Sequence, residues 1–155
     1  MKVSIIMGST SDYDTMSGAE KMLADFGIEY ETRVISAHRT PDLMFEYTKA
    51  LKGRGFGVVI AGAGGAAHLG GVAAGLTTLP VIAVPMPTKN LGGLDSLLSM
   101  VQMPTGIPVA TVAIGGAKNA AILAAEILAL SDRQISDKLD AYRQEQAEKI
   151  RNTTL

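Results

Sequence analysis

The side chains best suited to chemistry in this sequence lie in one polar segment, Ser36-Ala37-His38-Arg39-Thr40-Pro41. An unperturbed imidazole titrates at about pH 6.5, so His38 can donate or accept a proton near neutral pH. Arg39 carries a planar guanidinium that suits two-pronged contact with a phosphate group. Thr40 and Pro41 indicate a helix N-cap and first helical residue, which places His38 and Arg39 beside the positive end of a helix. A single loop histidine is more often incidental, so its interpretation depends on the neighbouring segments.

Two further segments have residues suited to ligand binding. Gly8-Ser9-Thr10-Ser11-Asp12 offers hydroxyls and backbone donors where a helix is expected to begin, which is a setting that binds anions. Asp12 could accept hydrogen bonds from sugar hydroxyls, or Ser11 or Asp12 could only cap the helix. The third segment, 62–71, consists of Gly, Ala and Leu around His68, and its small side chains let a ligand approach the backbone.

Several common catalytic and cofactor motifs are disfavoured. Gly62, Gly64 and Ala67 fit a dinucleotide-binding fingerprint, but no acidic residue occurs between Arg54 and Asp95, where that fingerprint requires one. No P-loop and no Gly-x-Ser-x-Gly elbow is present. The sequence has no cysteine and only two histidines, so it gives little support to a metal site.

Alternating strands and helices are predicted to position these segments. The predicted strands are 2–7, 30–35, 58–61, 81–84 and 109–113, and the predicted helices are 13–26, 41–52, 66–76, 94–102 and 119–130. This alternation favours a parallel sheet with helices on both faces, and the apolar strands are typical of such a sheet. The three segments described above follow the first three strands, at the edge of the sheet where such folds bind ligands.

Composition limits the class of protein. The chain has 155 residues, of which 47% are hydrophobic, and its net charge is -1, so we predict one α/β domain over 1–155 with a real core. Without a basic surface with aromatic residues, nucleic-acid binding is not expected. The uncharged run between Arg54 and Lys89 is long enough to span a membrane, but Gly residues, His68 and Pro80 divide it, so we expect no membrane segment. The N-terminal residues do not resemble a signal peptide, and we expect a cytoplasmic protein.

Two helices and the C-terminal segment bear on assembly. Helices 66–76 and 119–130 lack a polar face, so either other subunits cover them or one of them is the central helix of a tight monomer. The segment 131–155 is rich in both signs of charge, with apolar residues at helical spacing. It is predicted to be a helix that is either a solvated tail or an arm on a neighbouring subunit. The apolar residues of this segment are Ile135, Leu139, Tyr142 and Ile150.

The motifs taken together resemble those of class I 5-(carboxyamino)imidazole ribonucleotide mutases, over about residues 2–130. The matching segments are 8–12, 36–41, 61–69 and the run 93–104 that continues through 106–111. The related class II enzymes, which carboxylate aminoimidazole ribonucleotide with carbon dioxide, typically have Lys after the loop histidine and lack the Gly-Gly-Ala-Ala-His run. This sequence has Arg39 and keeps 64–68. It departs from the family at Gly70, where Pro is usual, and at Ala83, where Gly is usual.

This resemblance implies a three-layer α/β/α, flavodoxin-like (Rossmann-like) fold with a C-terminal helical arm, in a homo-octamer whose arm packs on a neighbouring subunit. It implies that a carboxylate moves within a small ribonucleotide in purine (IMP) biosynthesis, without ATP, metal or organic cofactor. His38 is then the proton carrier. The implied substrate-binding residues are Ser9, Ser11, Asp12, Ser36, Arg39, Ala63, Gly64, Ala67 and His68. The alternatives are direct carboxylation and a non-catalytic nucleotide-binding module.

Overall fold

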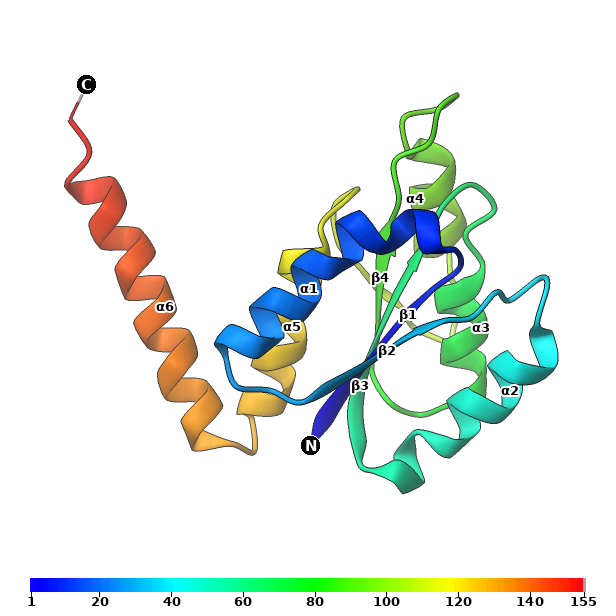
Figure 1. Cartoon of the computed structure of the whole chain (residues 1–155), viewed down its shortest axis with the longest axis horizontal. Coiled ribbons are helices and arrows are strands. Elements are labelled where there is room, and N and C mark those ends of the chain that lie inside the picture. Colours follow the sequence, from blue (N-terminus) through cyan, green and yellow to red (C-terminus); the bar gives the residue numbers. More distant parts are fainter. Residues whose placement is uncertain (155) are drawn as a thin grey trace.

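A five-stranded parallel sheet forms the centre of the protein, in the order β2-β1-β3-β4-β5 (Figure 1). The computed structural model describes residues 1–154. The strands are β1 (Lys2–Met7), β2 (Tyr30–Val34), β3 (Phe56–Ala63), β4 (Val81–Pro85) and β5 (Ala110–Thr111). This order is the flavodoxin-like one, and it confirms the predicted fold class.

Helices cover both faces of the sheet. They are α1 (Tyr13–Asp25), α2 (Pro41–Ala50), α3 (Leu69–Leu76), α4 (Leu94–Val101), α5 (Ala117–Ala129) and α6 (Arg133–Arg151), with short 3-10 turns at Thr10–Asp12 and Lys52–Arg54. Figure 1 shows α1 and α5 on one side of the sheet and α2 and α3 on the other. Each side has its own buried core, with Met16 and Ala124 in the first and Met44 and Met100 in the second.

The strands differ in burial according to their place in the sheet. Every residue of β3 and β4 is buried, as expected for central strands covered on both faces. β2 is an edge strand with the polar sequence YETRV, and three of its five residues are exposed. The predicted strand 109–113 is reduced to two residues at the other edge. The predicted helix 66–76 begins only at Leu69, because the glycine segment before it forms a turn in which Gly65 has a φ of 67°.

The chain itself covers most of α5. Six of its residues are buried against α1, α6 and the sheet, and its other apolar residues pack at the edge of the same core. Its own chain therefore supplies most of the cover of α5, and contact of its partly buried residues with another subunit stays a prediction. Helix α3 differs, since Val72 is 39% exposed on its outer face.

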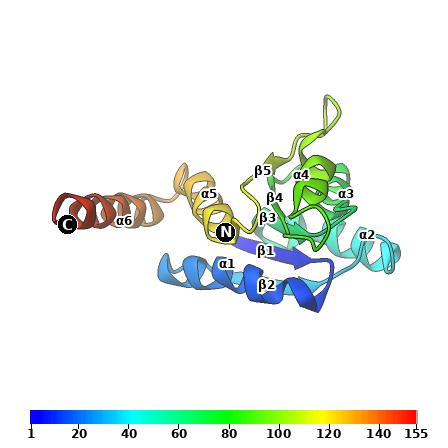
Figure 2. The ribbon, with the colours of Figure 1, turned by 90° about the horizontal axis from the view of Figure 1, so that it is seen from above.

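The C-terminal segment is helical, as predicted, and its first half packs on its own chain. Ile135 and Leu139 are buried against α5, and the Tyr142 ring meets the Phe26 ring edge-on with centroids 5.5 Å apart. Ile150, near the end of the helix, is 76% exposed. Figures 1 and 2 show that α6 extends away from the three layers. Leu155, the last residue of the predicted arm, lies outside the described residues.

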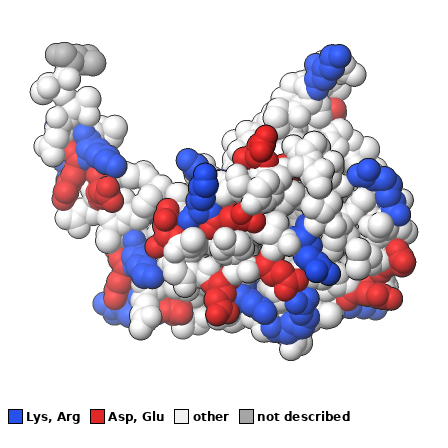
Figure 3. Space-filling view, viewed as in Figure 1, with Lys and Arg blue, Asp and Glu red and all other residues white. Residues whose placement is uncertain are grey.

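The charged side chains are distributed without an extended basic area on the face shown in Figure 3, where basic and acidic groups alternate. Within residues 1–154 no helix is both long enough and apolar enough to cross a membrane.

Gly70 and Ala83, the two positions at which the sequence is expected to depart from the resembled family, lie next to each other. Gly70 lies in the first turn of α3 against the sheet, and a Cβ built on it would be 3.3 Å from the Cβ of Ala83 in β4. That separation is tighter than ordinary van der Waals contact. The extra methyl of Ala83 therefore occupies room that a larger residue at position 70 would need, so the two changes compensate in volume.

This contact predicts coupled effects on stability. Gly70→Pro alone should lower the free energy of unfolding by about 1–3 kcal/mol through overpacking. Adding Ala83→Gly should return part of that loss, with a coupling energy of about 0.5–3 kcal/mol in a double-mutant cycle. Urea denaturation of the four proteins measures the cycle, and strictly additive effects would contradict the compensation.

Candidate active site

A cavity of about 550 Å³ lies beyond the carboxyl ends of β1, β2, β3 and β4. Its walls come from the three predicted segments and from a fourth segment after β4. The lining residues are Gly8, Ser9, Ser11, Asp12, Ser36, Ala37, His38, Arg39, Ala63, Gly64, Ala66, Leu69, Met86 and Pro87. Parallel sheets bind ligands at this edge, so the cavity is the candidate active site.

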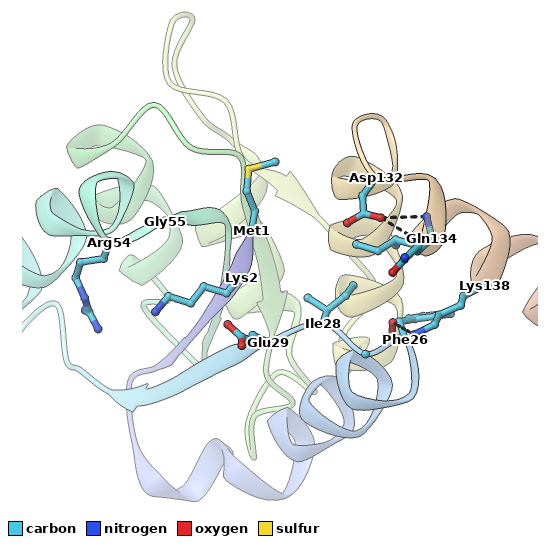
Figure 4. A pocket seen from close by; sticks show the side chains of 12 residues that line it. Met1, Lys2, Phe26, Ile28, Glu29, Arg54, Gly55, Asp132, Gln134 and Lys138 are labelled. Atoms are coloured by element: carbon cyan, nitrogen blue, oxygen red, sulfur yellow. Dashed lines mark hydrogen bonds between the residues drawn. The ribbon is translucent and has the colours of Figure 1, made fainter.

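A second cavity, of about 490 Å³, lies at the opposite end of the sheet, near the start of β1 and the start of α6 (Figure 4). Its polar groups already take part in the fold. The Lys138 ammonium donates to the Phe26 carbonyl at 2.7 Å, and the Asp132 carboxylate accepts the Gln134 N–H at 3.0 Å as the cap of α6. Residues of the predicted site are absent from the lining of this cavity.

The first segment presents to the cavity a carboxylate that does not cap a helix. Ser9 Oγ accepts hydrogen bonds from the Ser11 N–H at 3.3 Å and the Ser11 hydroxyl at 2.9 Å, so Ser9 caps the 3-10 turn. Asp12 stands at the N-cap position of α1 without capping it, so the interpretation of Ser11 or Asp12 as only a helix cap is wrong. Burial raises the pKa of the Asp12 carboxyl, while hydrogen bonds from Ser11 and Ser9 lower it. A partly desolvated carboxylate gains from further donors, such as sugar hydroxyls.

Arg39 connects the first and second segments. Its Nη2 donates to the Gly8 carbonyl at 2.8 Å, and its Nε donates to Ser36 Oγ at 3.2 Å. These contacts hold the guanidinium at the rim of the cavity, where its remaining N–H groups can meet an anion. Thr40 does not cap α2 as predicted, because its hydroxyl donates to the Ser36 carbonyl at 3.0 Å and accepts the Ser36 N–H at 3.1 Å. It stabilises the turn that carries His38 and Arg39.

The two histidines of the chain contact each other. His38 Nε2 lies 2.8 Å from His68 Nδ1, and the rings meet edge-on with centroids 4.9 Å apart. A hydrogen bond between these nitrogens needs one donor and one acceptor, so the pair cannot keep this contact when both rings are fully protonated. His38 lines the cavity, whereas His68 reaches the site through His38.

The third segment forms a wall of backbone and small side chains. Ala63, which is buried at the end of β3, and Gly64 line the cavity. A Cβ on Gly64 would lie 3.3 Å from the Cβ of Met86, so a larger residue would require Met86 to shift. Ala67 is 1% exposed and packs in the core below the cavity, so Ala67 and His68 are the two predicted binding residues that do not line the cavity.

Sequence reasoning missed the segment after β4. Met86 and Pro87 line the cavity, as do Ala37, Ala66 and Leu69. The signal for Met86 and Pro87 was present, because they follow a predicted strand at the same edge of the sheet as the other three segments. No group of three or more His, Cys, Asp or Glu side chains in residues 1–154 is placed to hold a metal ion.

Comparison with known proteins places the chain in one family. The AIR carboxylase family profile matches residues 2–149. The N5-carboxyaminoimidazole ribonucleotide mutase of Saccharolobus solfataricus is 56% identical over 154 residues, which cover 99% of this chain and 98% of that protein. The protein of the same name from Vibrio vulnificus is 59% identical over 152 residues, which cover 97% and 94% of the two chains.

A solved structure agrees with this assignment. The crystal structure of Treponema denticola PurE superposes with a TM-score of 0.86 at 36% identity, covering 96% of this chain and 92% of that one. Sequence, fold and the segments around the cavity therefore lead to one conclusion: the chain belongs to the AIR carboxylase family.

Proposed function

We propose that the protein is an N5-carboxyaminoimidazole ribonucleotide mutase, an isomerase of de novo purine biosynthesis. It interconverts 5-carboxyamino-1-(5-phospho-D-ribosyl)imidazole and 5-amino-1-(5-phospho-D-ribosyl)imidazole-4-carboxylate. Relatives of this name match nearly the whole chain at 56% and 59% identity. The structural observation that supports the proposal most is His38, which lines the same cavity as Ala63, Gly64 and Ala66.

The reaction needs a proton carrier whose protonation state is the same at the end of the reaction as at the start. Breaking the bond between nitrogen and carboxylate releases carbon dioxide, and the electron pair left on nitrogen takes a proton from protonated His38. The ring carbon then attacks carbon dioxide, and the proton on that carbon returns to His38. No proton is gained or lost overall. The cavity keeps the two fragments together between these steps, which replaces an encounter in solution with a positioned one.

The remaining site residues suit a ribose phosphate. The Arg39 guanidinium and the hydroxyls of Ser9, Ser11 and Ser36 offer donors to the phosphate, and the Asp12 carboxylate can accept from the ribose hydroxyls. Ala63 and Gly64 leave room for the planar imidazole. No step of this route uses ATP, a metal or an organic cofactor.

His68 is proposed to orient His38. Because His68 Nδ1 meets His38 Nε2, it fixes the angle of that ring and the tautomer that it can adopt. This differs from a direct contact with substrate, which was the role expected from the sequence.

Incubating the purified protein with the carboxyamino substrate, without ATP and in ¹³C-bicarbonate buffer, tests the function. A mutase forms the 4-carboxylate product faster than the substrate decomposes, and the product carries unlabelled carboxylate. Product that carries ¹³C instead would indicate direct carboxylation. Binding of the nucleotide without turnover would indicate a non-catalytic module.

We also propose a homo-octamer in the cytoplasm. A stripe of exposed apolar residues supports association, because these side chains follow helical spacing along one face of α4 and the loop before it. They are Leu91, Leu94, Leu98 and Val101, each 46–59% exposed. An exposed stripe of this kind is typical of a surface that another protein covers. The absence of cysteine fits a compartment in which disulfides do not form.

Light scattering at micromolar concentration should give about eight times the 16.2 kDa mass of the chain. Replacing Leu94 and Leu98 together by Glu should lower that mass, because charge on a buried apolar contact is costly. Glu at Tyr13, an exposed residue of α1 that is not part of the stripe, is the control and should leave the mass unchanged. A monomeric wild-type protein would contradict the proposal.

A further inference from the structure

Two serines of α4 bind the backbone on either side of Gly65, between two residues that line the cavity, Gly64 and Ala66. Ser96 is fully buried, and its Oγ accepts the Gly65 N–H at 3.0 Å and donates to the Met86 carbonyl at 2.8 Å. Ser99 Oγ shares its hydrogen between the Gly65 carbonyl at 3.2 Å and the Asp95 carbonyl at 2.7 Å. Neither serine lines the cavity. Both polar backbone groups of Gly65 are therefore bound to α4.

Gly65 is a residue whose conformation packing alone does not fix. Its φ of 67° lies in the left-handed region, and a Cβ built on it would meet nothing within 4 Å. Glycine has the largest conformational freedom to lose on ordering. The hydrogen bonds from the two serines therefore restrain a backbone that no side chain of its own holds in place.

The orientation of Gly65 determines where His68 lies. The Gly65 carbonyl also accepts the Ala67 N–H at 2.8 Å, and the Ala66 carbonyl accepts the His68 N–H at 2.9 Å. These two tight turns connect Gly65 to His68 with little freedom between them. His68 Nδ1 then contacts His38 Nε2 at 2.8 Å. A continuous set of contacts thus runs from α4 to the proposed proton carrier.

The start of α4 is itself tied to the fourth segment of the site. Thr88 Oγ1 donates to Asp95 Oδ1 at 2.7 Å and accepts the Gly93 N–H at 3.1 Å. With the bond from Ser96 to the Met86 carbonyl, these contacts fix α4 relative to the segment 86–88 as well as to Gly65. Helix α4 therefore fixes the positions of two walls of the cavity relative to each other.

We propose that Ser96 and Ser99 are positioning residues, which fix the Gly65 backbone and through it set the orientation of the pair His38 and His68. This inference rests on the proposed function only for its kinetic test. The contacts with substrate phosphate and ribose come from other segments, so loss of either serine should act on turnover more than on substrate binding.

Ser99→Ala is the variant to compare with Ser17→Ala. Both serines are half-buried in helices and donate to a backbone carbonyl of their own helix, Ser17 to Asp14 at 3.0 Å, but only Ser99 reaches Gly65. Ser99→Ala should lower kcat by about tenfold to a hundredfold with KM within about twofold of wild type, since small misplacement of catalytic groups has effects of this size. Ser17→Ala should leave both constants unchanged, and Ser99→Thr, which keeps the hydroxyl, should recover most of kcat.

Ser96→Ala should lower kcat further than Ser99→Ala, because it removes the hydrogen-bond partner of both the half-buried Gly65 N–H and the Met86 carbonyl. Thermal unfolding separates this effect from loss of the fold. If Ser99→Ala retains the kcat of Ser17→Ala, or if it raises KM and leaves kcat unchanged, the positioning role is wrong.

A second measurement does not depend on activity. The chain has only two histidines, so labelling histidine with ¹³C gives NMR signals from His38 and His68 alone. Ser99→Ala should move both sets of imidazole signals and Ser17→Ala should move neither. Unchanged signals in Ser99→Ala would overturn the inference even if the wild-type protein is an active mutase. Shifted signals would support it even if the wild-type protein proves inactive on the proposed substrate.

Discussion

The His38→Asn variant is expected to bind the ribonucleotide and to convert it about 10² to 10⁴ times more slowly than the wild-type protein, as is typical when a general acid and base is lost. Asparagine keeps a polar side chain of similar reach but cannot carry a proton between nitrogen and carbon at neutral pH. The contacts proposed for phosphate and ribose come from other residues, so binding of the 4-carboxylate product should stay near the wild-type value in calorimetry. Those residues are Arg39, Asp12, Ser9, Ser11 and Ser36.

The fold should survive this change, because His38 is an exposed loop residue and the turn around it is held by Ser36 and Thr40. His68→Asn is the matched control, since it removes the other imidazole and the same contact. It should lower kcat by less than His38→Asn does, because His68 acts through His38. Near wild-type turnover by His38→Asn, together with a large loss in His68→Asn, would assign the proton transfer to His68.

The sequence was sufficient to predict the class of fold. The spacing of apolar residues along the chain located all five strands and the helices between them. Buried parallel strands are short apolar runs bounded by glycine and polar turns, which makes them recognisable. The ends of elements were less predictable. Helix α3 was expected from residue 66, but Gly65 turns the chain and delays the helix to Leu69. Strand 109–113 is an edge strand, and only Ala110 and Thr111 pair with β4.

The coverage of α5 could not be read from its own residues. A helix without a polar face indicates burial, and the covering partner can be the same chain or another one. In the structure α1 and the first half of α6 supply most of that cover. Whether α6 covers α5 depends on where the chain turns between the two helices. Asp132 marks that point, because its side chain caps the start of α6. The composition of residues 131–155 indicated a helix but did not indicate how that helix would lie relative to α5.

The site was predicted as a set of segments, without the contacts within it. Four predicted residues follow the carboxyl ends of neighbouring parallel strands and line one cavity, as expected from the parallel topology. They are Ser9, Asp12, His38 and Arg39. The contact between His38 and His68 depends on strand order, because β2 and β3 lie on either side of β1. Alternation of strands and helices is compatible with several orders, so this pair could not be predicted from sequence spacing.

Local hydrogen bonding was the least predictable level. Thr40 and Asp12 occupy N-cap positions, yet neither side chain caps its helix. In each case a nearby hydroxyl or backbone group competes for the same side chain, and only the folded geometry decides between partners. These two residues instead shape the turn beside His38 and present a carboxylate to the cavity.

Arg39 is the residue whose replacement should weaken substrate binding most. In Arg39→Ala the affinity for the phosphorylated nucleotide should fall by about ten- to a hundredfold, because a charged hydrogen bond contributes roughly 1.5–3 kcal/mol. The structure adds a second cause, since the same guanidinium joins the Gly8 carbonyl to Ser36 and so holds two walls of the cavity together. Calorimetry with the phosphorylated product measures the loss.

Arg39→Lys separates the two causes. Lysine keeps the positive charge but presents a single ammonium, which cannot reproduce the planar contacts to Gly8, Ser36 and a phosphate at once. Its affinity should therefore lie between those of the wild type and Arg39→Ala. A nucleoside that lacks the phosphate gives a second comparison. If the guanidinium acts only through the phosphate, the wild type and Arg39→Ala should bind this nucleoside with equal affinity. If the link between Gly8 and Ser36 also matters, Arg39→Ala should bind it more weakly. Unchanged affinity of Arg39→Ala for the phosphorylated product would remove Arg39 from the site, because both causes would then be absent.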